Sequence, residues 1–142
     1  MGSPFTATID TSFAKGQAMS DWLVNVGAST TPGQLVIYGA KHTVDAVDAT
    51  LSQRWIYSAM PASVQYFSFN TPVGAAVGGQ CGKVVFSDLH VSAGSGNATT
   101  DDHSGPTLPF PTGCVTTDLS AQEKALEFML FDLSACLEPV VQ

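Results

Sequence analysis

The sequence predicts an α/β domain, with a central, mostly parallel sheet of about four or five strands flanked by helices. The alternative is an α+β domain with an antiparallel sheet. Three observations support the α/β class. The 142 residues fit one domain, 1–142; short β-branched and aromatic runs recur along the chain; and two amphipathic segments flank them. With 44% hydrophobic and 12% charged residues, the chain is neither disordered nor a coiled coil.

The first half of the chain combines one helix with several short strands. The alternating run at 5–9 predicts an edge strand, and residues 13–27 carry apolar side chains at helical spacing, ending at Gly27. Gly16 is a weak point of this helix. Compact β-rich runs predict strands at 35–38, 54–57 and 64–69, whereas the stretch 43–51 is ambiguous.

The second half has the clearest strand and the clearest helix. Residues 83–91 alternate, with Val85 and Leu89 on one face and Asp88 and His90 on the other. A polar loop, 92–112, follows. The last helix, 120–137, starts at a capping box formed by Ser120 and Glu123 and has one apolar stripe: Leu126, Met129, Leu130, Leu133 and Leu137.

Charge and the lack of long apolar runs exclude several classes of partner. Five basic and twelve acidic residues give a net charge of −7, which repels nucleic acid and anionic lipid. No apolar run approaches the ~18 residues of a membrane-spanning helix. No glycine-rich phosphate loop is present, so we expect no nucleotide cofactor.

The three cysteines bear on the compartment. Cys81 and Cys114 adjoin glycines at the edges of an irregular stretch, and Cys136 lies near the end of the last helix. We expect a disulfide between Cys81 and Cys114, worth about 3–4 kcal/mol in the chain-entropy model, with Cys136 as a competing partner. The alternative is three free, buried thiols. A disulfide would indicate a secreted or periplasmic protein.

A resemblance to a known family rests on the segment from Gly82 to His90 and on the helix that closes the chain. This segment resembles the C-terminal part of class I glutamine-amidotransferase-like domains of the trehalose-utilisation type. In that family a glycine-led strand ends in a histidine and a late helix packs on the sheet. The resemblance covers the last half of the chain and carries over His90 alone, because no cysteine occupies the position of the family's nucleophile. It implies that the chain is a fragment or a reduced version of such a domain.

A set of carboxylates and imidazoles suggests metal chemistry. Asp88, Asp101 and Asp102 could hold a divalent cation, with His90 and His103 as catalytic bases or further ligands. Oxygen ligands favour Ca²⁺, and the two imidazoles favour Zn²⁺ as the alternative. A bound ion could activate water and polarise an ester, which predicts an exported metal-assisted hydrolase of a small ester or lactone substrate. In the competing interpretation Asp88 caps a turn and the loop acids are only solvated.

Aromatic residues support a non-catalytic alternative. Trp55, Tyr57, Tyr66, Phe67 and Phe69 lie on adjacent predicted strands. They could form a platform for sugars or for another protein, or they could fill the core. The alternative function is therefore a carbohydrate- or protein-binding module of a larger secreted protein. An exposed sheet edge would also permit a homodimer through strands.

Overall fold

The five-stranded sheet is antiparallel throughout. The structure, a computed structural model, describes residues 4–89, 91 and 118–134. Its strands are β1 (Phe5–Ile9), β2 (Gln34–Ile37), β3 (Ser52–Ala59), β4 (Ala62–Thr71) and β5 (Gly82–Ser87). They lie in the order β2-β1-β3-β4-β5, and every neighbouring pair is antiparallel. The chain therefore has the α+β arrangement, and the prediction of a mostly parallel sheet is wrong.

Short connections explain the antiparallel order. β3 and β4 are joined by a tight turn at Met60 and Pro61, so β4 must run back along β3. Ten residues, 72–81, join β4 to β5 and include a short 3₁₀ helix, Val77–Gly79. A parallel pair needs a crossover of about a dozen residues or more. The β1–β2 and β2–β3 connections are that long, but β2 pairs antiparallel with β1, and β2 and β3 are not neighbours in the sheet.

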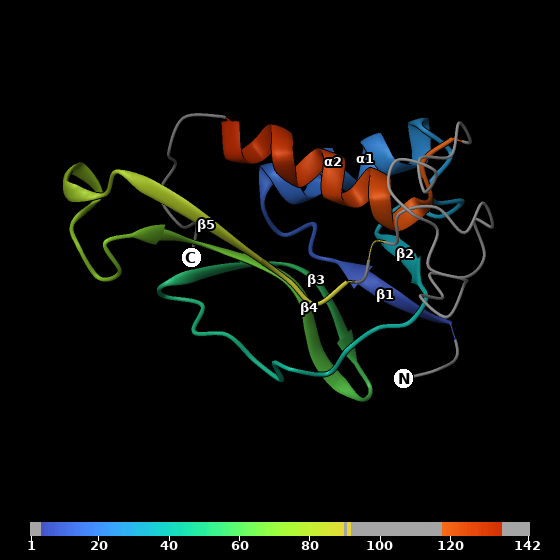
Figure 1. Cartoon of the computed structure of the whole chain (residues 1–142), viewed down its shortest axis with the longest axis horizontal. Helices are drawn as coiled ribbons and strands as arrows, with labels where there is room; N and C mark the ends of the chain where they lie inside the picture. Colours follow the sequence, from blue (N-terminus) through green and yellow to red (C-terminus); the bar gives the residue numbers. More distant parts are fainter. Residues whose placement is uncertain (1–3, 90, 92–117, 135–142) are drawn as a thin grey trace, which may run out of the picture.

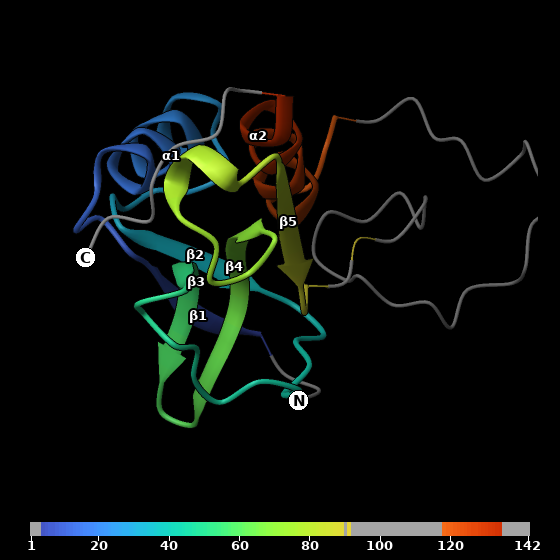
Figure 2. The ribbon, with the colours of Figure 1, turned by 90° about the vertical axis from the view of Figure 1, so that its left-hand side faces the viewer.

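Both helices, α1 (Ala14–Asn25) and α2 (Ala121–Ser134), cover the same face of the curved sheet (Figures 1 and 2). The ring of Trp55 lies at the centre of this layer, with ring centroids 4.9 Å from Phe13 and 6.2 Å from Phe128. One hydrophobic cluster joins the sheet to the helices, and its largest members include Trp55, Tyr66, Met19, Leu23 and Met129. The opposite side of the sheet, away from both helices, is called the outer face below.

Two glycines shape α1, one just after its last turn and one inside its first turn. Gly27 adopts a φ of 70°, which ends the helix where the sequence predicts. Gly16 is buried, and a Cβ there would collide with the backbone carbonyl of Asp10 and with the Phe13 ring. The missing side chain of Gly16 therefore lets the helix pack closely against the residue that follows β1. This contact explains why a glycine occupies a position where it weakens the helix.

The start of α2 confirms the predicted capping box. The amide of Glu123 donates to Ser120 Oγ at 3.2 Å, and the Ser120 amide donates to Glu123 Oε2 at 2.7 Å. The predicted apolar stripe is confirmed at Met129 but wrong at Leu130 and Leu133, which are exposed, and Leu137 lies outside the described residues. The buried residues of α2 are Gln122, Ala125, Met129 and Asp132.

Polar partners explain which face of α2 turns inward. The Gln122 amide bonds to both backbone groups of Tyr38, at 2.6 and 3.2 Å, and thereby ties the helix to the end of β2. The Asp132 carboxylate accepts a hydrogen bond from Lys15 Nζ of α1 at 2.6 Å and another from Lys83 Nζ of β5 at 3.0 Å.

Neither described helix is long and apolar enough to span a bilayer.

An irregularity in β3 decides which of its residues reach the outer face. The β3–β4 register shifts on both sides of Ile56, so that two successive side chains, Trp55 and Ile56, are buried. Arg54 and Tyr57 flank them, and the Arg54 guanidinium lies 3.5 Å above the Tyr57 ring centroid.

Candidate functional site

Asp88 is the one predicted metal ligand within the described residues. β5 ends at Ser87, so Asp88 does not lie on the strand as the alternation suggests. Its buried carboxylate accepts hydrogen bonds from the Thr43 amide and from Thr43 Oγ1, both at 2.8 Å. Both carboxylate oxygens thus hold the segment after β2 against the end of the sheet. Asp88 is therefore bound to a segment 45 residues earlier in the chain, which differs from the expected cap of a turn that follows it.

The rest of the predicted metal site, His90, Asp101, Asp102 and His103, lies outside the described residues. Within the described part, no three His, Cys, Asp or Glu side chains come close enough together to hold a metal ion. The calcium or zinc site therefore stays a prediction. The same is true of the disulfide, since Cys81 is a free, exposed thiol among the described residues while Cys114 and Cys136 lie beyond them.

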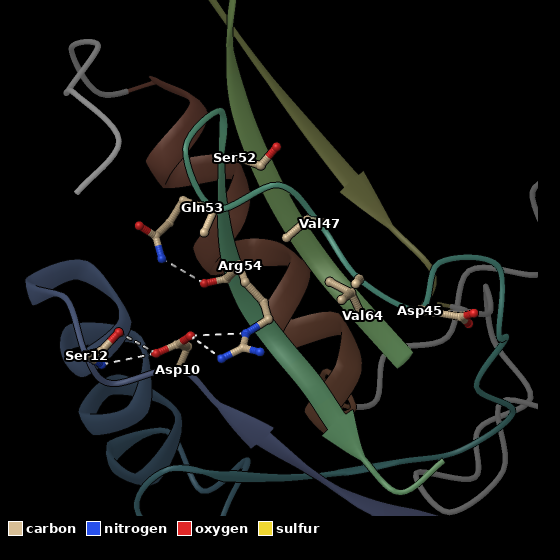
Figure 3. A pocket seen from close by; sticks show the side chains of 10 residues that line it. Asp10, Ser12, Asp45, Val47, Ser52, Gln53, Arg54 and Val64 are labelled. Atoms are coloured by element: carbon tan, nitrogen blue, oxygen red, sulfur yellow. Dashed lines mark hydrogen bonds and ion pairs between the residues drawn. The ribbon is translucent and has the colours of Figure 1, made fainter. Parts of the chain in front are cut away.

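A pocket of about 340 Å³ opens beside the first residues of β3 (Figure 3). Four segments form it: the end of β1 with the turn before α1, the chain that connects β2 to β3, the start of β3, and one residue of β4. Its lining residues are Asp10, Ser12, Asp45, Ala46, Val47, Ala49, Ser52, Gln53, Arg54 and Val64.

An ion pair between Asp10 and Arg54 organises this pocket. The Asp10 amide donates to the Trp55 carbonyl at 2.8 Å, which places the carboxylate beside β3. Arg54 Nε and Nη2 then donate to Asp10 Oδ2 at 3.1 and 2.9 Å, as the dashed lines in Figure 3 show. The other oxygen, Oδ1, accepts from the Ser12 amide and hydroxyl at 3.2 and 2.6 Å.

These contacts keep Asp10 ionised. Burial alone would raise its pKa, but the hydrogen bonds from Ser12 and Arg54 and the charge of Arg54 outweigh it, so the pKa lies below its usual value. The carboxylate in turn fixes the Arg54 guanidinium, which also stacks on Tyr57. Both charged groups are therefore held in place on the wall of the pocket.

The outer face next to this pocket is aromatic. Cross-strand pairing aligns Arg54, Phe67 and Phe86 in one row across β3, β4 and β5, and Ser52, Phe69 and Val84 in the next. The rings of Phe67 and Phe86 stack with centroids 5.0 Å apart, and those of Phe67 and Phe69 with centroids 6.2 Å apart. Phe67, Phe69 and Phe86, called the phenylalanine cluster below, are only partly buried.

The connecting chain covers the other end of the outer face. The Val64 amide donates to the Val44 carbonyl at 2.8 Å, and Gln65 Nε2 donates to the Lys41 carbonyl at 2.9 Å. This chain also carries the exposed pair between His42 and Asp45, with Nε2 and Oδ1 2.7 Å apart. Among the described residues, it thus lies over Val64 and Gln65, and the phenylalanine cluster lies beyond it.

The predicted aromatic platform is therefore divided between two faces. Trp55 and Tyr66 belong to the core, whereas Phe67 and Phe69 lie on the outer face. Sequence reasoning missed Phe86, although its alternation with the inward Val85 could have found it. It also missed Asp10 and Arg54, the single arginine of the chain.

A second pocket, of about 300 Å³, lies beside β2 and is lined by no ionisable side chain.

Comparison with protein-family models, with curated proteins and with solved structures found no match. The resemblance to amidotransferase-like domains accordingly stays a prediction.

Proposed function

We propose that the protein is a non-catalytic carbohydrate-binding module. The observation that carries the proposal is the continuity of two surfaces, because Arg54 and Ser52 line the pocket and also stand in the same cross-strand rows as the phenylalanine cluster. A surface that joins aromatic rings to a few fixed polar groups suits a ligand with both apolar and hydrogen-bonding faces. Sugars have this character, since their C–H faces are apolar and their rims carry hydroxyl groups.

The charges around the pocket favour a neutral sugar over an anionic one. The ionisable side chains that line the pocket are two carboxylates, Asp10 and Asp45, and one guanidinium, that of Arg54, so their charges sum to a negative value. An anionic ligand would be repelled, because like charges in a partly desolvated site are costly. A hydroxyl group, in contrast, can accept from a guanidinium N–H and donate to a carboxylate oxygen.

Preorganisation supports the same proposal. The Arg54 side chain is 39% exposed, yet Asp10 and the Tyr57 ring hold its position. Only two of its nitrogens, Nε and Nη2, donate to Asp10, and they share one oxygen, which leaves further N–H groups to a ligand. A side chain that is already fixed loses little conformational entropy when a ligand binds.

The metal-assisted esterase or lactonase stays a prediction, resting on Asp101, Asp102, His90 and His103. Export of the protein, and its place in a larger secreted protein, also stay predictions.

Affinity electrophoresis against a panel of neutral and acidic soluble polysaccharides tests the proposal, followed by NMR titration with oligosaccharides of any that retard the protein. We expect retardation by a neutral polysaccharide, unchanged by EDTA. Phe86→Ala and Arg54→Gln should each weaken binding about tenfold or more. Phe131→Ala is the matched control, because Phe131 is 62% exposed on α2, and it should bind like the wild type.

Three outcomes would contradict the proposal. The first is that no polysaccharide retards the protein, and the second is that all variants bind equally. The third is EDTA-sensitive hydrolysis of p-nitrophenyl esters or homoserine lactones, which would support the hydrolase instead.

A further inference from the structure

Within the described residues, β5 is the last strand at one side of the sheet, and only one of its edges is paired. The Asp88 amide donates to the Gln65 carbonyl of β4 at 2.8 Å, in register with the pairing of Phe67 and Phe86. Backbone groups of an antiparallel strand alternate between its two sides. Those of Val84 and Phe86 therefore face β4, and those of Lys83, Val85 and Ser87 face away from the sheet. No described strand pairs with that side.

Edge strands in monomeric proteins are commonly protected by lysine, proline or a bulge. β5 contains neither a proline nor a register shift, and its single charged residue is Lys83. The Lys83 ammonium does not guard the edge, because it bonds to Asp132 at 3.0 Å and the side chain is only 9% exposed. Val84 is 40% exposed beside the phenylalanine cluster. The edge thus combines backbone groups that no described residue pairs with and uncharged, partly exposed side chains.

We propose that β5 pairs with β5 of a second copy of this chain, antiparallel about a two-fold axis through Val85. In this register Val85 lies opposite Val85 of the partner subunit, and the two exchange both backbone hydrogen bonds. Lys83 pairs in the same way with Ser87 of the partner subunit. On the outer face, Phe86 lies opposite Val84 of the partner subunit, an aromatic and β-branched pair of the kind that stabilises antiparallel strands. A two-fold pair of this kind needs a self-complementary strand, and the sequence around Val85 meets that condition.

The lack of acidic residues on β5 allows a second copy of this acidic chain to bind at this edge. Two chains of net charge −7 repel each other wherever their acidic residues meet. β5 contains no acidic residue, and the carboxylate of Asp88, next along the chain, is buried on Thr43. The edge is thus a place where two acidic chains can meet with little local repulsion. Salt should strengthen the dimer, because it screens the remaining long-range repulsion.

Sedimentation equilibrium of the full chain over a range of concentrations and salt tests this pairing. We expect a monomer–dimer equilibrium whose Kd falls as salt rises. Val84→Lys places an ammonium beside Phe86 of the partner subunit and should raise Kd about tenfold or more. Val36→Lys is the matched control, since Val36 is 43% exposed on β2, at the other edge of the sheet, and it should leave Kd unchanged.

Amide hydrogen exchange at several protein concentrations identifies the strand involved. The amides of Lys83, Val85 and Ser87 should become protected as the dimer forms, whereas those of Val84 and Phe86 are protected already in the monomer. A wild-type chain that stays monomeric at every concentration and salt would overturn the proposal. It would also be overturned if Val36→Lys dissociated the dimer as well as Val84→Lys does, or if the three amides exchanged independently of concentration. None of these readouts depends on carbohydrate binding.

Discussion

Replacing Asp132 by Asn should destabilise the protein more than any other exchange of an acid for its amide within the described residues. The Asp132 side chain is 2% exposed and receives the ammonium groups of Lys15 and Lys83, which tie α1 and β5 to α2. Asparagine keeps the shape of the side chain but removes its charge. Lys83, 9% exposed, then has a buried ammonium without this anion, whereas Lys15, 25% exposed, can turn toward water.

The magnitude follows from the cost of breaking a buried ion pair. Removing one partner of such a pair costs about 3–5 kcal/mol, a large share of the roughly 5–15 kcal/mol that stabilises a domain. With a urea m-value of about 2 kcal/mol/M, the midpoint of unfolding should fall by about 2 M. Urea unfolding at pH 7, followed by far-ultraviolet circular dichroism, measures this shift.

Two further variants decide whether the buried charges are the cause. Asp118→Asn is the matched control, because Asp118 is 84% exposed although it pairs with Lys124 at 2.8 Å, and its midpoint should not change. Adding Lys83→Met to Asp132→Asn should recover part of the loss, since the buried ammonium is then gone. A midpoint for Asp132→Asn within about 0.5 M of the wild type, or strictly additive effects in the double variant, would refute the reasoning.

Two other expectations concern local stability. Burial raises the pKa of Tyr66, an effect that the Ser87 hydroxyl opposes in part, and the Tyr66 hydroxyl has no hydrogen-bond partner of good geometry. The folded state therefore favours the neutral phenol. Wild-type stability, measured by thermal melts, should be level below about pH 10 and fall as the pH rises above it. The Tyr66→Phe variant should show a smaller fall over the same alkaline range. An equal decline in both proteins would contradict the assignment. Ser120→Ala removes the hydroxyl of the α2 capping box and should cost about 1 kcal/mol in urea unfolding, with an unchanged free energy as the contrary result.

Local signals in the sequence predicted the elements better than their arrangement. The Ser120 and Glu123 box and the stop at Gly27 depend on contacts within a few residues, and both are confirmed. Strand direction depends instead on how the connections turn, and short apolar runs look alike in parallel and antiparallel sheets. The inward face of α2 could not be predicted from hydrophobicity either. Its buried Asp132 depends on ion pairs with two lysines that lie 117 and 49 residues away in the sequence.

The candidate site was less predictable than the fold. The clusters of acids and histidines in the sequence point to the segment around Asp88. In the structure Asp88 is satisfied by Thr43, while the described pocket depends on the contact between Asp10 and Arg54, 44 residues apart. Nothing in either local sequence marks that pair, and only the antiparallel neighbourhood of β1 and β3 brings it together.

The irregularity in β3 links the core to the proposed binding surface. In a regular strand Arg54 and Ile56 would point to the same face, and Trp55 to the other. Burying both Trp55 and Ile56 under the helices requires the register shift, and the shift leaves Arg54 and Tyr57 together on the outer side, where the guanidinium stacks on the ring. Arg54 is thus aligned with Phe67 because the core takes two successive residues from β3. If carbohydrate binds to this row, its affinity should depend on the packing of Trp55, on the opposite face of the sheet, as well as on the residues that touch the ligand.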